Sequence, residues 1–231
     1  MRATHHPVPA WREQVGSLLR DRKPVVVAEM LVVVLIPALW GLLPLPRTII
    51  PLLLLAWLSL WLRQRGWGDV GLRRPKSWFL TFSLGIAIGG SIEILGYTVI
   101  NPVLLRLIGE AADPRDFSIL RGNLPAFLTL LAFTWPLAAV AEEMVYRGYV
   151  LNRLADLFGQ SRLGWGISLI LSAVMFSLAH GQYSLRFIVT SSLMGLIEGG
   201  SYLLNRRNLW LPIIVHGVSN TISLTLVFLG I

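Results

Sequence analysis

The chain has 231 residues, of which 55% are hydrophobic and only 14% are charged, whereas a soluble domain carries about 25% charged residues. This composition predicts an integral membrane protein. The net charge is +8, but the arginines fall between apolar runs and not along one polar face, which excludes nucleic acid as a partner. Because the chain has no cysteine, a disulfide framework and a thiol nucleophile are excluded as well.

The N-terminal segment, residues 1–24, is polar, basic and proline-containing. We expect it to form a basic cytoplasmic tail, in which Trp11 to Arg20 could fold as a short interfacial helix. The first apolar run begins at Val25 and has no evident small-residue cleavage site before or within it. It is therefore predicted to be a membrane span and not a signal peptide.

Apolar runs of roughly 20 residues are long enough to cross the hydrocarbon of a bilayer. The candidate spans are Val25–Leu43, Thr48–Leu62, Trp78–Ile100, Leu124–Ala141, Leu163–Ala179, Leu185–Leu204 and Leu209–Leu229. The stretch 103–121 is amphipathic and is either a surface helix or an eighth, partial element. The predicted fold is thus an all-α, polytopic membrane helix bundle with about seven to eight transmembrane helices and a buried polar cavity. Residues 25–231 are expected to form one membrane-embedded domain.

The basic residues indicate an orientation. With the N-terminus in the cytoplasm, the inside segments 1–24, 63–77, 153–162 and 205–208 carry fourteen basic residues, and the outside loops carry five. Cytoplasmic loops of membrane proteins are enriched in Lys and Arg. We therefore expect a multi-pass protein with a cytoplasmic N-terminus.

Two adjacent carboxylates, Glu142 and Glu143, stand at the end of the apolar run that begins at Leu124. Successive helical residues point about 100° apart, so the two acids cannot share one face. Glu143 and Arg147 are four residues apart and can form an ion pair, which leaves Glu142 to point elsewhere. A structural ion pair at the headgroup boundary would explain Glu143 and Arg147, but it would not explain Glu142.

Two later spans carry histidine. Phe176 and His180 lie one helical turn apart, so the ring can support the imidazole; a satisfied polar group at a helix end is the alternative. His216 and Asn220 are also four apart, inside an otherwise apolar run, where unsatisfied polar groups cost several kcal/mol. Hydrogen bonding between helices is the alternative for this pair.

Together these segments supply a carboxylate pair, one histidine and a His-Asn pair. A carboxylate and a histidine can jointly hold and deprotonate a water molecule. A second histidine and an amide can donate hydrogen bonds to an oxyanion. These functional groups are sufficient to hydrolyse an amide without a nucleophilic side chain.

The three motifs resemble the signature of the CAAX prenyl protease type 2 and bacteriocin-processing family, also called the abortive-infection family of intramembrane glutamic endopeptidases. The signature reads Glu142-Glu143-x-x-x-Arg147, Phe176-x-x-x-His180 and His216-x-x-x-Asn220, in order, within residues 124–224.

This resemblance implies that Glu142 activates water together with His180. It implies that His216 and Asn220 stabilise the oxyanion, with Glu143 and Arg147 in support. The implied substrate is a membrane-anchored or lipidated protein, prenylated in some relatives, and the implied setting is a prokaryotic cell membrane. Membrane lipids are the other expected partner, and no cofactor is expected.

Other mechanisms are weighed against this one. A zinc site from Glu142, His180 and His216 is chemically feasible, although no His-Glu-x-x-His occurs. Gly66-Trp67-Gly68-Asp69 resembles an intramembrane aspartic protease motif but lies outside any span, and it is predicted to be a turn. No Gly-x-Ser-x-Gly elbow supports a serine hydrolase. A non-catalytic scaffold or immunity protein of the same fold is the alternative from another class.

Geometry constrains the predicted site, because straight spans would place Glu142 and His180 near opposite ends of the membrane. We therefore expect the helix that carries Glu142 to continue to about Leu157, with Pro136 kinking it. The acids Glu93 and Glu198 also lie in apolar runs, and helix packing is the default expectation for both.

Overall fold

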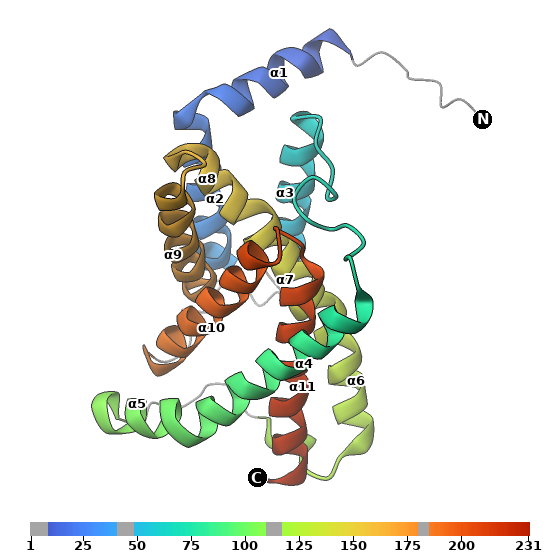
Figure 1. The fold of residues 1–231 in the computed structure, drawn as a ribbon. Helices are drawn as coiled ribbons and strands as arrows, with labels where there is room; N and C mark the ends of the chain where they lie inside the picture. The colour runs from blue at the N-terminus through green and yellow to red at the C-terminus, as the bar shows by residue number, and fades with distance from the viewer. Residues whose placement is uncertain (1–8, 41–48, 110–116, 180–184) are drawn as a thin grey trace, which may run out of the picture.

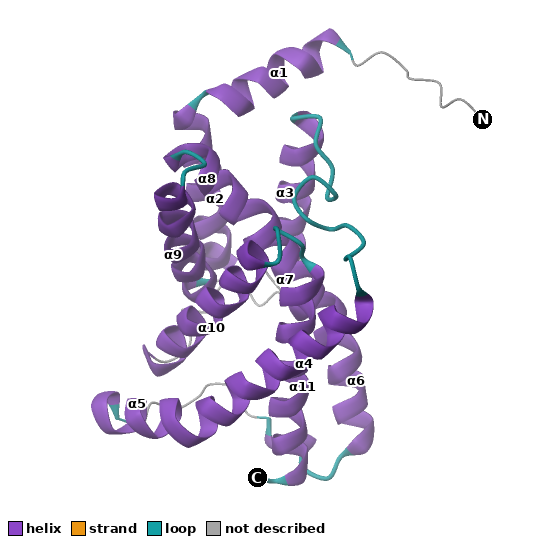
Figure 2. Ribbon diagram, in the orientation of Figure 1, coloured by secondary structure: helices purple, strands orange, loops and turns teal. Residues whose placement is uncertain are grey.

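The computed structural model describes residues 9–40, 49–109, 117–179 and 185–231. Within these ranges the chain is helical and contains no strand, in agreement with the predicted all-α class (Figure 2). The helices are α1 (Ala10–Asp21), α2 (Lys23–Trp40), α3 (Ile49–Leu62), α4 (Trp78–Leu95), α5 (Asn101–Ile108), α6 (Leu124–Thr134), α7 (Ala141–Glu143), α8 (Leu151–Phe158), α9 (Arg162–Leu178), α10 (Leu185–Leu204) and α11 (Trp210–Leu229).

Each of the seven predicted spans coincides with a helix, but fewer of them have the length of a membrane span. Four helical stretches of the described residues are long and apolar enough to cross a membrane: Trp78–Ile108, Leu124–Phe158, Leu185–Leu204 and Trp210–Leu229. Two shorter apolar helices, Ile49–Leu62 and Arg162–Leu178, accompany them. The protein is thus a helical membrane protein, and the full count of seven to eight spans stays a prediction.

One continuous helix of 35 residues, Leu124–Phe158, carries the acidic motif. As predicted, it runs past Arg147, with an irregularity at Pro136. Two π-helical turns, Trp135–Val140 and Met144–Val150, flank the short α7 segment. Proline lacks the amide hydrogen and clashes with the preceding turn, and π-turns inside α-helices occur frequently at functional sites.

Helix α11 packs closely against α4 and against the Leu124–Phe158 helix, which we call the motif helix (Figure 1). A Cβ atom on Gly85 would lie 2.4 Å from Ile214, and one on Gly89 would lie 2.8 Å from the carbonyl oxygen of Val215. One on Gly217 would lie 2.5 Å from the indole of Trp135. Small residues let helices approach this closely in a membrane, and here they fix the position of α11 next to α7.

Helix α1 lies across one end of the bundle (Figure 1). Arg12 donates to the carbonyl oxygen of Trp61 at the end of α3. Nearby, Arg153 of α8 donates to the carbonyl oxygen of Leu19 in α1 and to Glu29 of α2. Glu29 is therefore paired inside the bundle.

This end of the bundle also buries Arg63, which follows α3 and is paired with Asp156. Burial, together with the charge of Arg153, lowers the pKa of Arg63 to about 10. Both arginines are only a few per cent exposed. The network connects the three N-terminal helices to the motif helix through its α8 end.

Replacing Gly89 by Ala is expected to destabilise the protein by about 1–3 kcal/mol, the usual cost of overpacking. The new methyl would meet the backbone of α11, which cannot move aside as a side chain can. The measurement is the free energy of unfolding in detergent. Gly90→Ala is the matched control, because no atom lies within 4 Å of its added methyl. Equal stability of the two variants would contradict this packing.

Candidate active site

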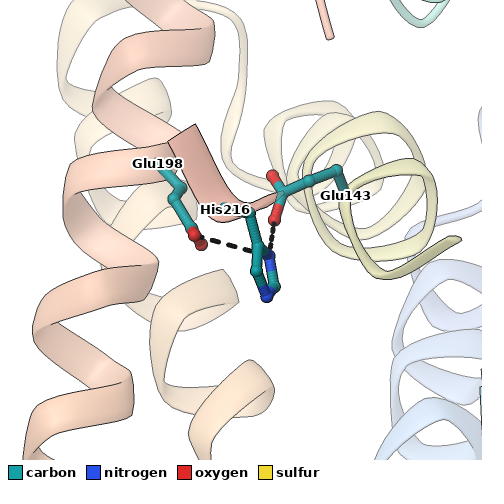
Figure 3. A group of neighbouring side chains, drawn as sticks. All are labelled: Glu143, Glu198 and His216. Carbon is teal, nitrogen blue, oxygen red and sulfur yellow. Dashed lines mark hydrogen bonds and ion pairs between the residues drawn. The ribbon is translucent and has the colours of Figure 1, made fainter. Parts of the chain in front are cut away.

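Three helical segments bring the predicted acids and one predicted histidine together. Glu142 and Glu143 lie on α7, His216 lies on α11, and a third acid, Glu198, comes from α10. Figure 3 shows Glu143 and Glu198 approaching the same edge of the His216 ring. Glu143 and Glu198 are fully buried, and His216 is 5% exposed.

Arg147 holds two of these acids at once. Its Nη1 donates to Oε1 of Glu143 at 2.8 Å, the ion pair that the spacing of four residues predicts. Its Nη2 donates to Oε2 of Glu198 at 2.6 Å. Arg147 is 1% exposed, so in this setting both carboxylates need its positive charge to remain buried.

His216 presents its two nitrogens to different acids. Nδ1 lies 2.9 Å from Oε1 of Glu143 and 3.4 Å from Oε1 of Glu198. Nε2 lies 4.0 Å from Oε2 of Glu142. Because carboxylate oxygens accept, the geometry assigns a hydrogen to Nδ1, and Nε2 faces Glu142.

This arrangement adds a contact that helix geometry did not predict. Glu143 pairs with Arg147 as expected, but it also contacts His216. The structure places His216 closer to Glu143 than to Glu142. The reason is that an imidazole carries its nitrogens on opposite edges, so one ring can contact two acids that leave the helix in different directions.

Glu142 differs from the other two acids in exposure. Its side chain is 17% exposed, whereas the side chains of Glu143 and Glu198 have no exposed surface. Glu142 and the Nε2 edge of His216 therefore form the accessible side of the cluster, and the Arg147 side is closed.

Phe176 of α9 completes the closed side. Its ring lies perpendicular to that of His216, with centroids 6.2 Å apart, and it also contacts Tyr146 edge-on at 5.1 Å. The guanidinium carbon of Arg147 lies 4.5 Å from the Phe176 ring centre, a cation–π contact. Phe176 thus contacts both Arg147 and His216. Its predicted partner was His180, one helical turn later in the chain.

Two predicted residues are not joined to this cluster by a described contact. His180 lies outside the described residues, and α9 ends at Leu178. Asn220 follows His216 by one turn and is half-buried. The convergence of Glu142, His180, His216 and Asn220 on one cavity therefore stays a prediction.

Glu198 belongs to the site, although the sequence predicted only a role in helix packing for it. Its signal was present, because an ionisable residue inside an apolar run is a functional candidate in a membrane protein. The partner could not be named from spacing, since Arg147 is 51 residues away in the chain. The other unassigned acid, Glu93, accepts hydrogen bonds from Ser219 and Ser223 of α11, and so it does fit the helix-packing expectation.

A metal could be considered at Glu143, Glu198 and His216, whose donor atoms lie within 4.8 Å of one another. This set shares only His216 with the predicted zinc ligands Glu142, His180 and His216. Arg147 already bonds one oxygen of each carboxylate, and His216 shares the same Glu143 oxygen. The guanidinium thus supplies the positive charge that a divalent cation would bring, so these donors fit a metal poorly.

The fold and this cluster define a class, a helical membrane protein with a buried acid–imidazole site. Residues 124–222 match the family described as type II CAAX prenyl endopeptidase Rce1-like. The matched segment carries the acidic motif and both motif histidines, which supports the resemblance drawn from the three motifs. No curated protein and no solved structure matches the chain.

Replacing Arg147 by Lys should lower the free energy of unfolding by about 1–3 kcal/mol, the cost of leaving one buried acceptor without its partner. A lysine ammonium keeps the charge but lacks the fork that reaches Glu143 and Glu198 together. Unfolding in detergent measures the effect. Arg162→Lys, on an exposed arginine at the start of α9, is the control, and equal stability of both variants would contradict the bridging role.

Proposed function

We propose that this protein is an intramembrane endopeptidase that hydrolyses peptide bonds with an activated water molecule. The observation that carries the proposal is the division among the acids. Glu143 and Glu198 are occupied by Arg147, while Glu142 is accessible and faces Nε2 of His216 at 4.0 Å. A general base has to be within reach of its proton directly or through one water molecule, and among the three acids Glu142 alone meets that requirement.

The proposed reaction assigns a step to each group. Glu142 takes a proton from water as the oxygen attacks the carbonyl carbon of the scissile bond, and the carbonyl becomes an oxyanion. His216 and Asn220 donate hydrogen bonds to that oxyanion. When the C–N bond breaks, Glu142 returns the proton to the leaving amine. His180 is assigned to hold the water with Glu142, as the family resemblance implies.

The substrate class follows from the family and the surroundings of the site. The matched family is described as a prenyl endopeptidase, and the acids lie on a helix long enough to cross a membrane. We therefore propose a membrane-anchored or lipidated protein substrate, of which a prenylated CAAX protein is one case. The distribution of basic residues supports a cytoplasmic N-terminus, and the proposed setting is a prokaryotic cell membrane.

The central test compares the two adjacent acids. Glu142→Gln should lower kcat/KM for a peptide substrate by about 10²–10⁴-fold, the usual contribution of a general base, and should leave stability nearly unchanged. Glu143→Gln should lower stability as well as rate, because it removes a charge from the buried pair with Arg147; breaking such a pair costs ~3–5 kcal/mol. Peptide cleavage and thermal unfolding in detergent are measured for both variants.

Two outcomes would count against this assignment. Cleavage by Glu142→Gln at the wild-type rate would show that Glu142 is not the base, and Glu143 would become the first alternative. If the wild-type protein cleaves no membrane-anchored peptide and membrane proteomes with and without Glu142→Ala do not differ, the non-catalytic scaffold is the better interpretation.

We further propose that catalysis needs no resident metal ion, since Arg147 already neutralises Glu143 and Glu198, two of the three buried donors that lie close together. Strong chelators are expected to leave the cleavage rate unchanged, and elemental analysis of the purified protein should find no stoichiometric zinc. The contrary result is stoichiometric zinc with activity that is lost to chelators and restored by zinc.

A further inference from the structure

Four ionisable side chains form one closed, buried group, which we call the charge quartet: Glu143, Arg147, Glu198 and His216. Its members come from the motif helix, α10 and α11. None is more than 5% exposed. Every link runs between a donor and a carboxylate oxygen, from Arg147 to each acid and from His216 Nδ1 toward each acid.

The charge of the quartet depends on His216. Two carboxylates and one guanidinium sum to one negative charge, which a neutral imidazole would leave uncompensated. An isolated charge is very costly to bury, and ion pairs inside a protein persist where the charges balance. A doubly protonated His216 brings the sum to zero.

A neutral quartet could also form if Glu198 carried the extra proton, but the contacts argue against it. Oε2 of Glu198 accepts from Arg147 at 2.6 Å, a distance typical of a bond between two ionised groups. Oε1 is buried and has no hydrogen-bond partner, and Nδ1 of His216 lies 3.4 Å from it. A proton on Oε1 would face a donor, whereas an ionised Oε1 attracts a charged imidazole.

The protonation state of His216 decides what Nε2 can do. With Nδ1 committed to the carboxylates, a neutral ring leaves Nε2 as a bare acceptor. Such a nitrogen cannot donate to an oxyanion. The doubly protonated ring instead presents an N–H on the accessible edge, next to Glu142.

We propose that Glu198 is a positioning residue: its carboxylate, together with Glu143, keeps His216 doubly protonated, so that Nε2 donates a hydrogen bond to the carbonyl oxygen of the substrate. Glu198 acts through His216 and does not touch the substrate. This inference rests on the proposed function for its catalytic consequence, but the protonation state itself does not depend on turnover.

The test combines nitrogen NMR of isotopically labelled histidine with kinetics. The His216 signals are identified by their loss in His216→Gln. In the wild-type protein at neutral pH, both ring nitrogens of His216 should show the signature of the doubly protonated ring. In Glu198→Gln, the ring should become neutral with its hydrogen on Nδ1. Its kcat should fall by about 10²-fold, the usual cost of one lost oxyanion donor, while KM stays unchanged.

Two further variants separate positioning from folding. Glu198→Asp keeps the charge and should retain the doubly protonated ring and part of the rate. Glu93→Gln removes another acid from an apolar helix, one whose contacts are Ser219 and Ser223, and it should leave the His216 signals unchanged. If Glu198→Gln does not fold, the wild-type and Glu198→Asp spectra decide the question.

The inference is overturned by a neutral His216 in the wild-type protein, or by a ring that stays doubly protonated in folded Glu198→Gln. An equal kcat loss in Glu93→Gln would overturn the specific role of Glu198. Failure of the proposed function looks different: a wild-type rate in Glu142→Gln would remove the assigned base and leave the NMR signature of the quartet intact.

Discussion

The site depends on the guanidinium of Arg147, which joins Glu143 and Glu198 across two helices. Without it, two buried carboxylates would face each other near a histidine, and repulsion between them would separate α7 from α10. The planar fork suits this task, because it offers parallel donors in a fixed geometry and stays charged when buried. Phe176 covers the face of the same guanidinium. Arg147 is therefore fixed by the aromatic ring as well as by its two ion pairs.

This electrostatic connection requires helices that approach closely, and small residues provide the approach. Gly195 faces Ala173, so that α10 lies against α9, and Gly217 faces Trp135, so that α11 lies against the motif helix. Gly217 follows His216 directly in the chain. The contact of Gly217 with Trp135 therefore fixes α11 against the motif helix and, at the adjacent residue, the position of the His216 imidazole relative to the acids.

Much of the fold could be predicted from apolar runs, since every predicted span coincides with a helix. The Glu143–Arg147 pair was also predictable, because spacing of four residues is a local property. The contact of His216 with Glu143 and the pairing of Glu198 with Arg147 were not, since they depend on how three helices are oriented. Pro136 indicated an irregularity in the helix, but the two π-helical turns could not be predicted. A single wider turn is too short to change the spacing of apolar residues in a recognisable way.

The acids at the end of the bundle and the acids of the site differ in exposure. Glu29 and Asp156 join buried arginines at the end of the bundle, and their own side chains are 11% and 18% exposed, so water still reaches these carboxylates. Glu143 and Glu198 lie where no water replaces a missing partner, so their pairing is a condition of the fold. Asp156 and Glu143 lie on the same helix and both pair with arginine, but only the Glu143 side chain is completely buried.

The length of the motif helix has a consequence for the choice of substrate. At 1.5 Å per residue its 35 residues extend roughly 52 Å, well beyond a hydrocarbon layer of about 30 Å. Glu142 stands close to the middle of this helix, so under the proposed function a scissile bond must come far from either end of the helix to reach it. A peptide strand at that depth has to leave water, and its amide groups lose their hydrogen-bond partners until the protein supplies new ones. Under the proposed function, this depth would favour chains tethered to the membrane over freely diffusing peptides of the same sequence.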